Sequence, residues 1–110
     1  MKVIIVEPFK APYAGEIAGD LKSMQDTVGG YIETICPFDD EKIILVCNEQ
    51  GAIENLRLNR LIHNATTGWS NWIRGTFFLC YSDGGEGMIS IPDELIYTYT
   101  EKLKGVVVST

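Results

Sequence analysis

Histidine, closely spaced cysteines and long apolar runs are scarce in this sequence, and each scarcity excludes a class of protein. The chain has one histidine, and none of its three cysteines is spaced as C-x-x-C. Zinc sites usually take ligands in pairs at short spacing, whereas a site here would gather them from four separate segments, so we expect no metal and no cofactor. The cysteines are odd in number and lie in strand-like segments. We therefore expect them to be small buried hydrophobic residues of a protein in a reducing compartment. These residues are Cys36, Cys47 and Cys80.

Membrane spans and an excess of basic residues are also missing. Even the longest apolar runs, such as Ile43-Ile44-Leu45-Val46-Cys47, are far shorter than the ~18 residues of a membrane span, and Met1-Lys2-Val3 does not open an apolar signal sequence. With 9 Lys+Arg against 15 Asp+Glu, the formal net charge is -6, which is opposite to what a general nucleic-acid binder needs. We therefore expect a cytoplasmic protein that binds neither membranes nor nucleic acids in general.

Familiar catalytic and phosphate-binding motifs are absent. The sequence contains no G-x-S-x-G, no H-E-x-x-H, no Walker loop and no G-x-G-x-x-G. Gly84-Gly85-Glu86-Gly87 is rich in glycine but has no lysine and follows Asp83, so it predicts an exposed turn. Asp39-Asp40-Glu41 predicts a solvated hairpin tip in preference to a weak cation site. These observations favour a protein that is not an enzyme.

What the sequence does contain is typical of one small globular domain. The 110 residues suffice for a single core, and 45% of them are hydrophobic while 22% are charged. Strand-like runs occupy residues 2–7, 31–36, 42–48 and 76–81, with a shorter one at 13–17. The run at 42–48 is apolar on both faces, which predicts a central strand. We expect a single α+β domain over residues 1–110, with a mixed or antiparallel sheet of about four to six strands and two helices.

The two helices are predicted from caps and spacing. Asp20 is a candidate N-cap, and Leu21, Met24 and Val28 share one helical face before Gly29-Gly30 ends the helix. A second helix is predicted from a capping box at 90–93 to about residue 104. Residues 52–62 match neither the helical nor the strand period, residues 64–71 predict a loop, and residues 106–108 predict an edge strand or a contact surface.

Several short segments together resemble one protein family. They are Lys2-Val3-Ile4-Ile5-Val6-Glu7-Pro8, Asp20 to Gln25, Val28 to Glu33, Cys47 to Gly51, Asn59-Arg60 and Gly75 to Leu79. They are similar to the family catalogued as domain of unknown function 3846. The resemblance implies a small protein encoded by phages, plasmids and gut-type bacteria, with no enzymatic activity attached to it. By analogy, small mobile-element proteins of this kind often act against host defences, in the host cytoplasm when a phage encodes them.

One part of the chain departs from the acidic character of the rest. Residues 55–82 contain all three arginines and no Asp or Glu, so their formal charge is +3 and the other 82 residues carry -9. The same stretch holds the histidine and both tryptophans. Arginine binds phosphate bidentately, indole rings stack on bases, and asparagine amides recognise polar edges. The candidate ligand-binding residues, with two tyrosines as further stacking partners, are Arg57, Asn59, Arg60, His63, Trp69, Trp72, Arg74, Tyr13 and Tyr31.

The leading hypothesis is a non-enzymatic phage or mobile-element protein that sequesters a small anionic nucleotide-type ligand, such as an immune signal. Because the chain is short, we expect a homo-oligomer whose pocket lies at an interface, with Val106-Val107-Val108 as one contact. Three alternatives stay open. The arginines could pair with carboxylates while the tryptophans and His63 serve the core. The acidic surface could inhibit a basic protein partner. Or the chain could be a regulatory subunit with no small ligand.

Overall fold

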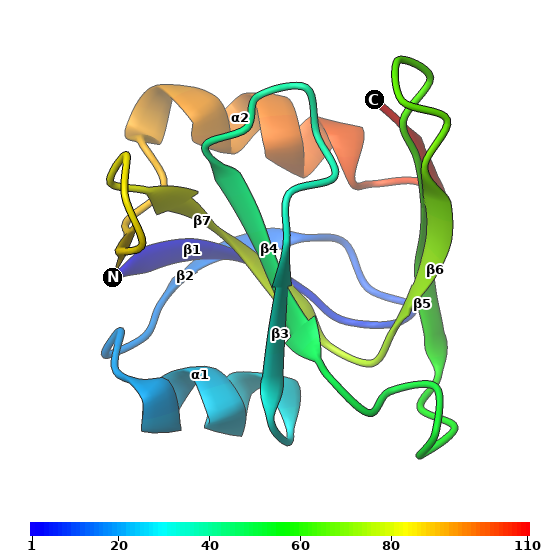
Figure 1. The fold of residues 1–110 in the computed structure, drawn as a ribbon, viewed down its shortest axis with the longest axis horizontal. Helices are drawn as coiled ribbons and strands as arrows, with labels where there is room; N and C mark the ends of the chain where they lie inside the picture. Colours follow the sequence, from blue (N-terminus) through cyan, green and yellow to red (C-terminus); the bar gives the residue numbers. More distant parts are fainter.

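Continuous apolar runs form the interior of the larger of two sheets in the computed structural model, which describes residues 1–110 (Figure 1). Its strands run in the order β2-β1-β7-β4-β3, with β8 paired to β7, and every pairing is antiparallel. The strands are β1 (Lys2–Val6), β2 (Tyr13–Glu16), β3 (Ile32–Ile35), β4 (Ile43–Asn48), β7 (Phe77–Ser82) and β8 (Met88–Ile89). The expectation that residues 42–48 form an interior strand is confirmed, because β4 lies between β3 and β7.

The interior strands are apolar on both faces because both faces of this sheet are covered. Phe78 and Val46 belong to a core beneath α1 (Leu21–Val28), whereas Phe77 and Leu79 belong to a second core beneath α2 (Asp93–Lys102). The two helices lie on opposite sides of the sheet in Figure 1. Neither helix is long and apolar enough to cross a membrane.

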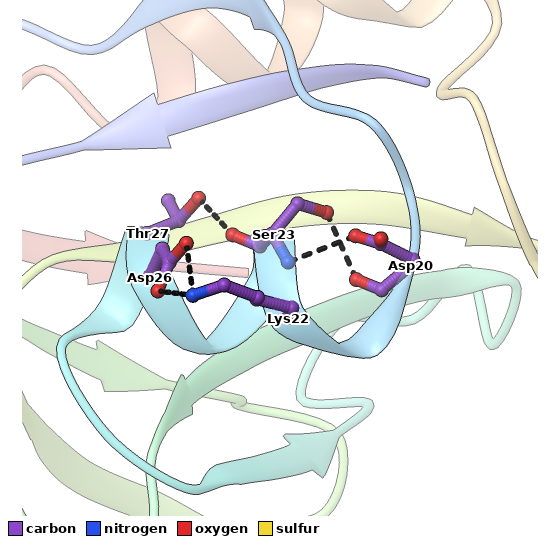
Figure 2. Close-up of polar contacts among 5 residues, drawn as sticks. All are labelled: Asp20, Lys22, Ser23, Asp26 and Thr27. Carbon is purple, nitrogen blue, oxygen red and sulfur yellow. Dashed lines mark hydrogen bonds and ion pairs between the residues drawn. The ribbon is translucent and has the colours of Figure 1, made fainter.

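Helix α1 begins and ends where the sequence predicts. The Asp20 carboxylate accepts a hydrogen bond from the Ser23 backbone N–H at 2.9 Å, and Gly29 ends the helix with a φ of 80° (Figure 2). Figure 2 also shows Lys22 paired with Asp26 one turn later, at 3.3 Å. Donors at the first turn of a helix lack intrahelical partners, so the Asp20 carboxylate supplies what the backbone cannot.

Helix α2 is present, but the predicted capping box is wrong. Pro92 occupies the N-cap position and makes no side-chain hydrogen bond there. The Ser90 hydroxyl is already used elsewhere, because it accepts a hydrogen bond from the Lys2 backbone N–H at 2.8 Å. Asp93 begins the helix and pairs with the Lys2 ammonium at 2.8 Å. Lys2 therefore links β1 to the start of α2 through both its backbone N–H and its side chain.

A second, three-stranded sheet was not predicted. Its order is β6-β5-β9, made from β5 (Leu58–His63), β6 (Ser70–Arg74) and β9 (Val107–Ser109), with β5 and β9 parallel. It lies on the α2 side of the large sheet and contributes Ile62, Ile73 and Val108 to that core, at the right-hand side of Figure 1. The expected edge strand at the C-terminus is confirmed, since β9 pairs only with β5.

A β-bulge explains why β5 escaped the sequence pattern. Leu58 pairs with Arg74, yet Arg60 pairs with Ile73, so Asn59 is one extra residue in the strand. Asn59 and Arg60 are consequently both buried, at 2% exposure each. Two adjacent buried polar residues break the alternation of apolar and polar residues by which strands are recognised.

The cysteine prediction holds for two of three residues. Cys47 and Cys80 are buried in β4 and β7, but Cys36 is exposed because β3 ends at Ile35 and the chain turns there. All three thiols are free. No group of three or more His, Cys, Asp or Glu side chains lies close enough together to hold a metal ion.

Candidate ligand-binding groove

Asn59 and Arg60 fasten the start of β5 to three other parts of the chain. The Asn59 amide donates to the Val6 carbonyl at 2.9 Å and to the Gly75 carbonyl at 2.8 Å. The Arg60 Nε donates to the Leu103 carbonyl at 2.7 Å, and its Nη2 donates to the Lys10 carbonyl at 2.8 Å. The bulge turns both side chains inward, so these two predicted ligand residues bind the protein's own backbone.

Arg60 is a buried cation without a carboxylate partner. Its Nη1 donates to the Asn59 Oδ1 at 2.8 Å, and its Nε bonds to Leu103, the residue that ends α2. Carbonyl groups at a helix C-terminus carry partial negative charge, which favours a cation there. Burial lowers the pKa of the Arg60 guanidinium, but an arginine stays charged in proteins because its ordinary pKa is so high. Arg60 therefore acts as a structural cation.

A groove of about 680 Å³ lies next to this anchor, and Asn59 is one of its lining residues. No acidic side chain lines the groove. Its walls come from the β1–β2 loop, the turn before β5, the paired ends of β5 and β6, and the segment before β9. The lining residues are Phe9, Asn55, Leu56, Arg57, Leu58, Asn59, Trp72, Arg74 and Val106. A volume of this size falls within the range of pockets that hold small molecules.

The other two arginines of the acid-free stretch, exposed Arg57 and half-buried Arg74, both line this groove without carboxylate partners. Arg57 lies over the Phe9 ring, with its guanidinium carbon 5.6 Å from the ring centroid. The Arg74 Nη1 donates to the Asn55 Oδ1 and to the Leu56 carbonyl, both at 3.2 Å. Each of the four ion pairs in the structure uses a lysine. The alternative in which the arginines pair with the abundant carboxylates is therefore not what the structure shows.

The two tryptophans occupy different positions. Trp72 is 38% exposed, lines the groove and stands opposite Leu61 in β5. Trp69 is half-buried, packs against the core, and lines an adjoining hollow of about 430 Å³ that it shares with Trp72 and Arg74. The carboxylates of Glu33 and Glu49 also line that hollow, so an anion is favoured in the groove and disfavoured next to it.

Three predicted residues lie away from the groove. His63 is exposed at the opposite end of β5, where it pairs with Ser70. Tyr13 is on the edge strand β2, and its hydroxyl donates to the Glu7 carboxylate at 3.0 Å. Burial and this hydrogen bond raise the pKa of Tyr13. Tyr31 lines a separate hollow whose other residues include two carboxylates. The structure therefore gathers Arg57, Asn59, Trp72 and Arg74 and leaves these three outside.

Five groove residues were not among the candidate ligand-binding residues: Phe9, Asn55, Leu56, Leu58 and Val106. Val106 was expected only as an oligomer contact. Asn55 lay within the acid-free stretch, so its amide could have been included. Phe9 follows Pro8 in a loop and is far from the arginines in sequence, and only the fold brings it to Arg57.

One comparison with known proteins gave a match. The family model described as Domain of unknown function (DUF3846) matches residues 1–104, which is nearly the whole chain. No curated protein and no solved structure matches the chain. Inference about function therefore depends on the groove.

Proposed function

Since the chain belongs to the DUF3846 family, whose description names no activity, we propose a function from the groove: a non-enzymatic binding protein that sequesters a small anionic nucleotide-type ligand. The observation that carries the proposal is that Arg57 and Arg74, in an acidic protein, line one acid-free groove with no carboxylate partner. Neither guanidinium is neutralised by a carboxylate, and the N–H groups that Arg74 does not use on Asn55 and Leu56 remain donors for a phosphate or carboxylate.

The remaining side chains of the groove suit the rest of a nucleotide. Trp72 presents a partly exposed indole in the same groove, and an aromatic face stacks on any base. The Asn55 amide holds Arg74 with its oxygen, which leaves the amide nitrogen as a donor. A phosphate between the two arginines and a base against the aromatic wall is the binding mode that we propose.

The biological role that accompanies this proposal is capture of a nucleotide immune signal for a phage or mobile element. Capture needs tight binding and no chemistry, which fits a groove whose lining contains no nucleophile or acid–base pair. We also propose a homo-oligomer. β9 pairs on one side only, and Val107 is 63% exposed, so its outer edge can pair with another copy.

Calorimetric titration of the full chain with a panel of mononucleotides and cyclic dinucleotides tests the function. We expect binding that falls at least tenfold in Arg57→Ala and in Arg74→Ala, because each loses a charged partner of the phosphate. Lys42→Ala is the matched control, since Lys42 is an exposed cation outside the groove. Native mass spectrometry of protein purified from cells identifies any co-purified ligand and the number of subunits.

Two results would contradict the proposal. One is a chain that binds no member of the panel and carries no adduct. The other is binding that the two arginine variants leave unchanged. Salt-sensitive binding of a basic protein with no nucleotide binding would instead support the alternative of an acidic protein-binding inhibitor.

A further inference from the structure

Phe9 has an unusual backbone for a bulky residue. The Lys10 N–H donates to the Glu7 carbonyl at 3.2 Å, closing a turn with Pro8 second and Phe9 third. Phe9 has a φ of 65°, the sign that a type II turn requires at its third position. Glycine normally fills that position because a side chain is strained there. The chain therefore places a phenyl ring where the backbone favours having none.

Packing does not account for this ring. Phe9 is 82% exposed, so its side chain gains almost none of the stabilisation that burial gives an aromatic residue. The ring lies against the Arg57 guanidinium, whose carbon is 5.6 Å from the ring centroid. Costly backbone conformations that persist without a packing benefit are concentrated at ligand clamps and active sites.

The turn is fastened on both sides of Phe9 by the buried anchor. Asn59 bonds to the Val6 carbonyl, and Arg60 bonds to the Lys10 carbonyl, so the residues flanking the turn cannot easily move. In Figure 1 the loop between β1 and β2 reaches across to the small sheet, where this anchor lies. A ring held this way is oriented before any ligand arrives, which lowers the entropic cost of binding.

We infer that Phe9 is a stacking platform for the base of the ligand, which makes the groove select base-bearing phosphates over plain sugar phosphates. This inference rests on the proposed function and deepens it. The phosphate is held by the Arg57 and Arg74 guanidinium groups, while the exposed ring of Phe9 takes the base. Arg57 then has two roles, because it contacts the phosphate and orients the ring.

The test compares 5′-AMP with ribose 5-phosphate, which has the same sugar and phosphate but no base. In the wild-type chain we expect 5′-AMP to bind about tenfold more tightly, which is the size of one stacked base. Phe9→Gly should abolish this preference and leave the affinity for ribose 5-phosphate unchanged. Phe9→Tyr should retain the preference, because it keeps the ring. Phe9→Gly should also melt at the wild-type temperature or above it, since glycine relieves the strained φ.

Each other outcome overturns the inference in a recognisable way. If Phe9→Gly weakens both ligands equally, the ring only positions Arg57. If it lowers the melting temperature by several degrees, the ring serves the fold. If it leaves the preference for 5′-AMP intact while Arg74→Ala abolishes binding, the base stacks elsewhere and the proposed function stands. If the wild-type chain binds neither ligand nor any nucleotide of the panel, both proposals fail together.

Discussion

Replacing the buried Arg60 by methionine tests whether this cation holds the fold together. Methionine matches the aliphatic stem of arginine and has no charge, so Arg60→Met removes the hydrogen bonds and keeps the packing of that stem. Arg60 is 2% exposed and bonds to the Leu103 carbonyl at 2.7 Å and to the Asn59 Oδ1 at 2.8 Å. Both acceptors would be left without that partner inside the protein.

The magnitude follows from these two bonds. A buried hydrogen bond from a charged donor contributes about 1.5 kcal/mol or more, so losing two costs about 3 kcal/mol of unfolding free energy. The bond to the Lys10 carbonyl at 2.8 Å adds less, because this carbonyl is only partly buried and water can replace the guanidinium. The opposing effect is that the variant no longer buries a charge. We expect the lost bonds to prevail, because the acceptors of Arg60 are fixed in place by the fold.

Urea unfolding followed by tryptophan fluorescence measures this change. With a slope of about 1.5 kcal/mol per molar urea, a loss of about 3 kcal/mol lowers the midpoint by about 2 M. Arg57→Met is the matched control. It removes the same charge from an exposed side chain, and we expect a change below about 1 kcal/mol. A midpoint for Arg60→Met at or above that of the wild type would refute the reasoning, because relief from the buried charge would then exceed the lost bonds.

Two further predictions concern titratable groups. Burial raises the pKa of Cys47 to about 11 and that of Cys80 to about 12. At about pH 8 a thiol reagent should therefore modify only the exposed Cys36 in the native protein, which mass spectrometry can measure. Modification of two thiols in the folded chain would contradict the burial of Cys47 and Cys80. Hydrogen bonding to Ser23 lowers the pKa of Asp20. The Asp20 carboxylate therefore stabilises the fold fully above the ordinary carboxyl pKa, and this stabilisation disappears as pH falls through the lowered folded-state pKa. The wild type should therefore lose more of its urea midpoint than Asp20→Asn between about pH 7 and pH 3, and equal losses would argue against this cap.

The elements that the sequence predicts correctly are those whose signals are local. In α1, Asp20 and Gly29 mark the ends, and Met24 and Val28 mark the buried face, all within about three turns. In β4, a continuous apolar run predicts a strand covered on both faces, and α1 and α2 provide that cover. Such patterns can be recognised because each depends on neighbours close in the chain.

The small sheet and its bulge could not be recognised in this way. β5 pairs with β9, more than forty residues later, and its two buried polar residues are satisfied by carbonyl groups of distant segments. The capping box at Ser90 fails for the same reason, because the hydroxyl bonds to Lys2 at the other end of the chain. A residue's type says which bonds it can make, but not which distant partner it meets.

For the groove, the sequence alone determined that positive charge and indole rings are concentrated in residues 55–82, a stretch without Asp or Glu. The tertiary structure decided which of these residues face a ligand. The bulge at Asn59 turns Arg60 into the core, whereas Arg57 and Arg74 line the groove together with Phe9. The physical reason is that composition sets the chemistry available to a segment, while strand register and long-range packing set the direction in which each side chain points.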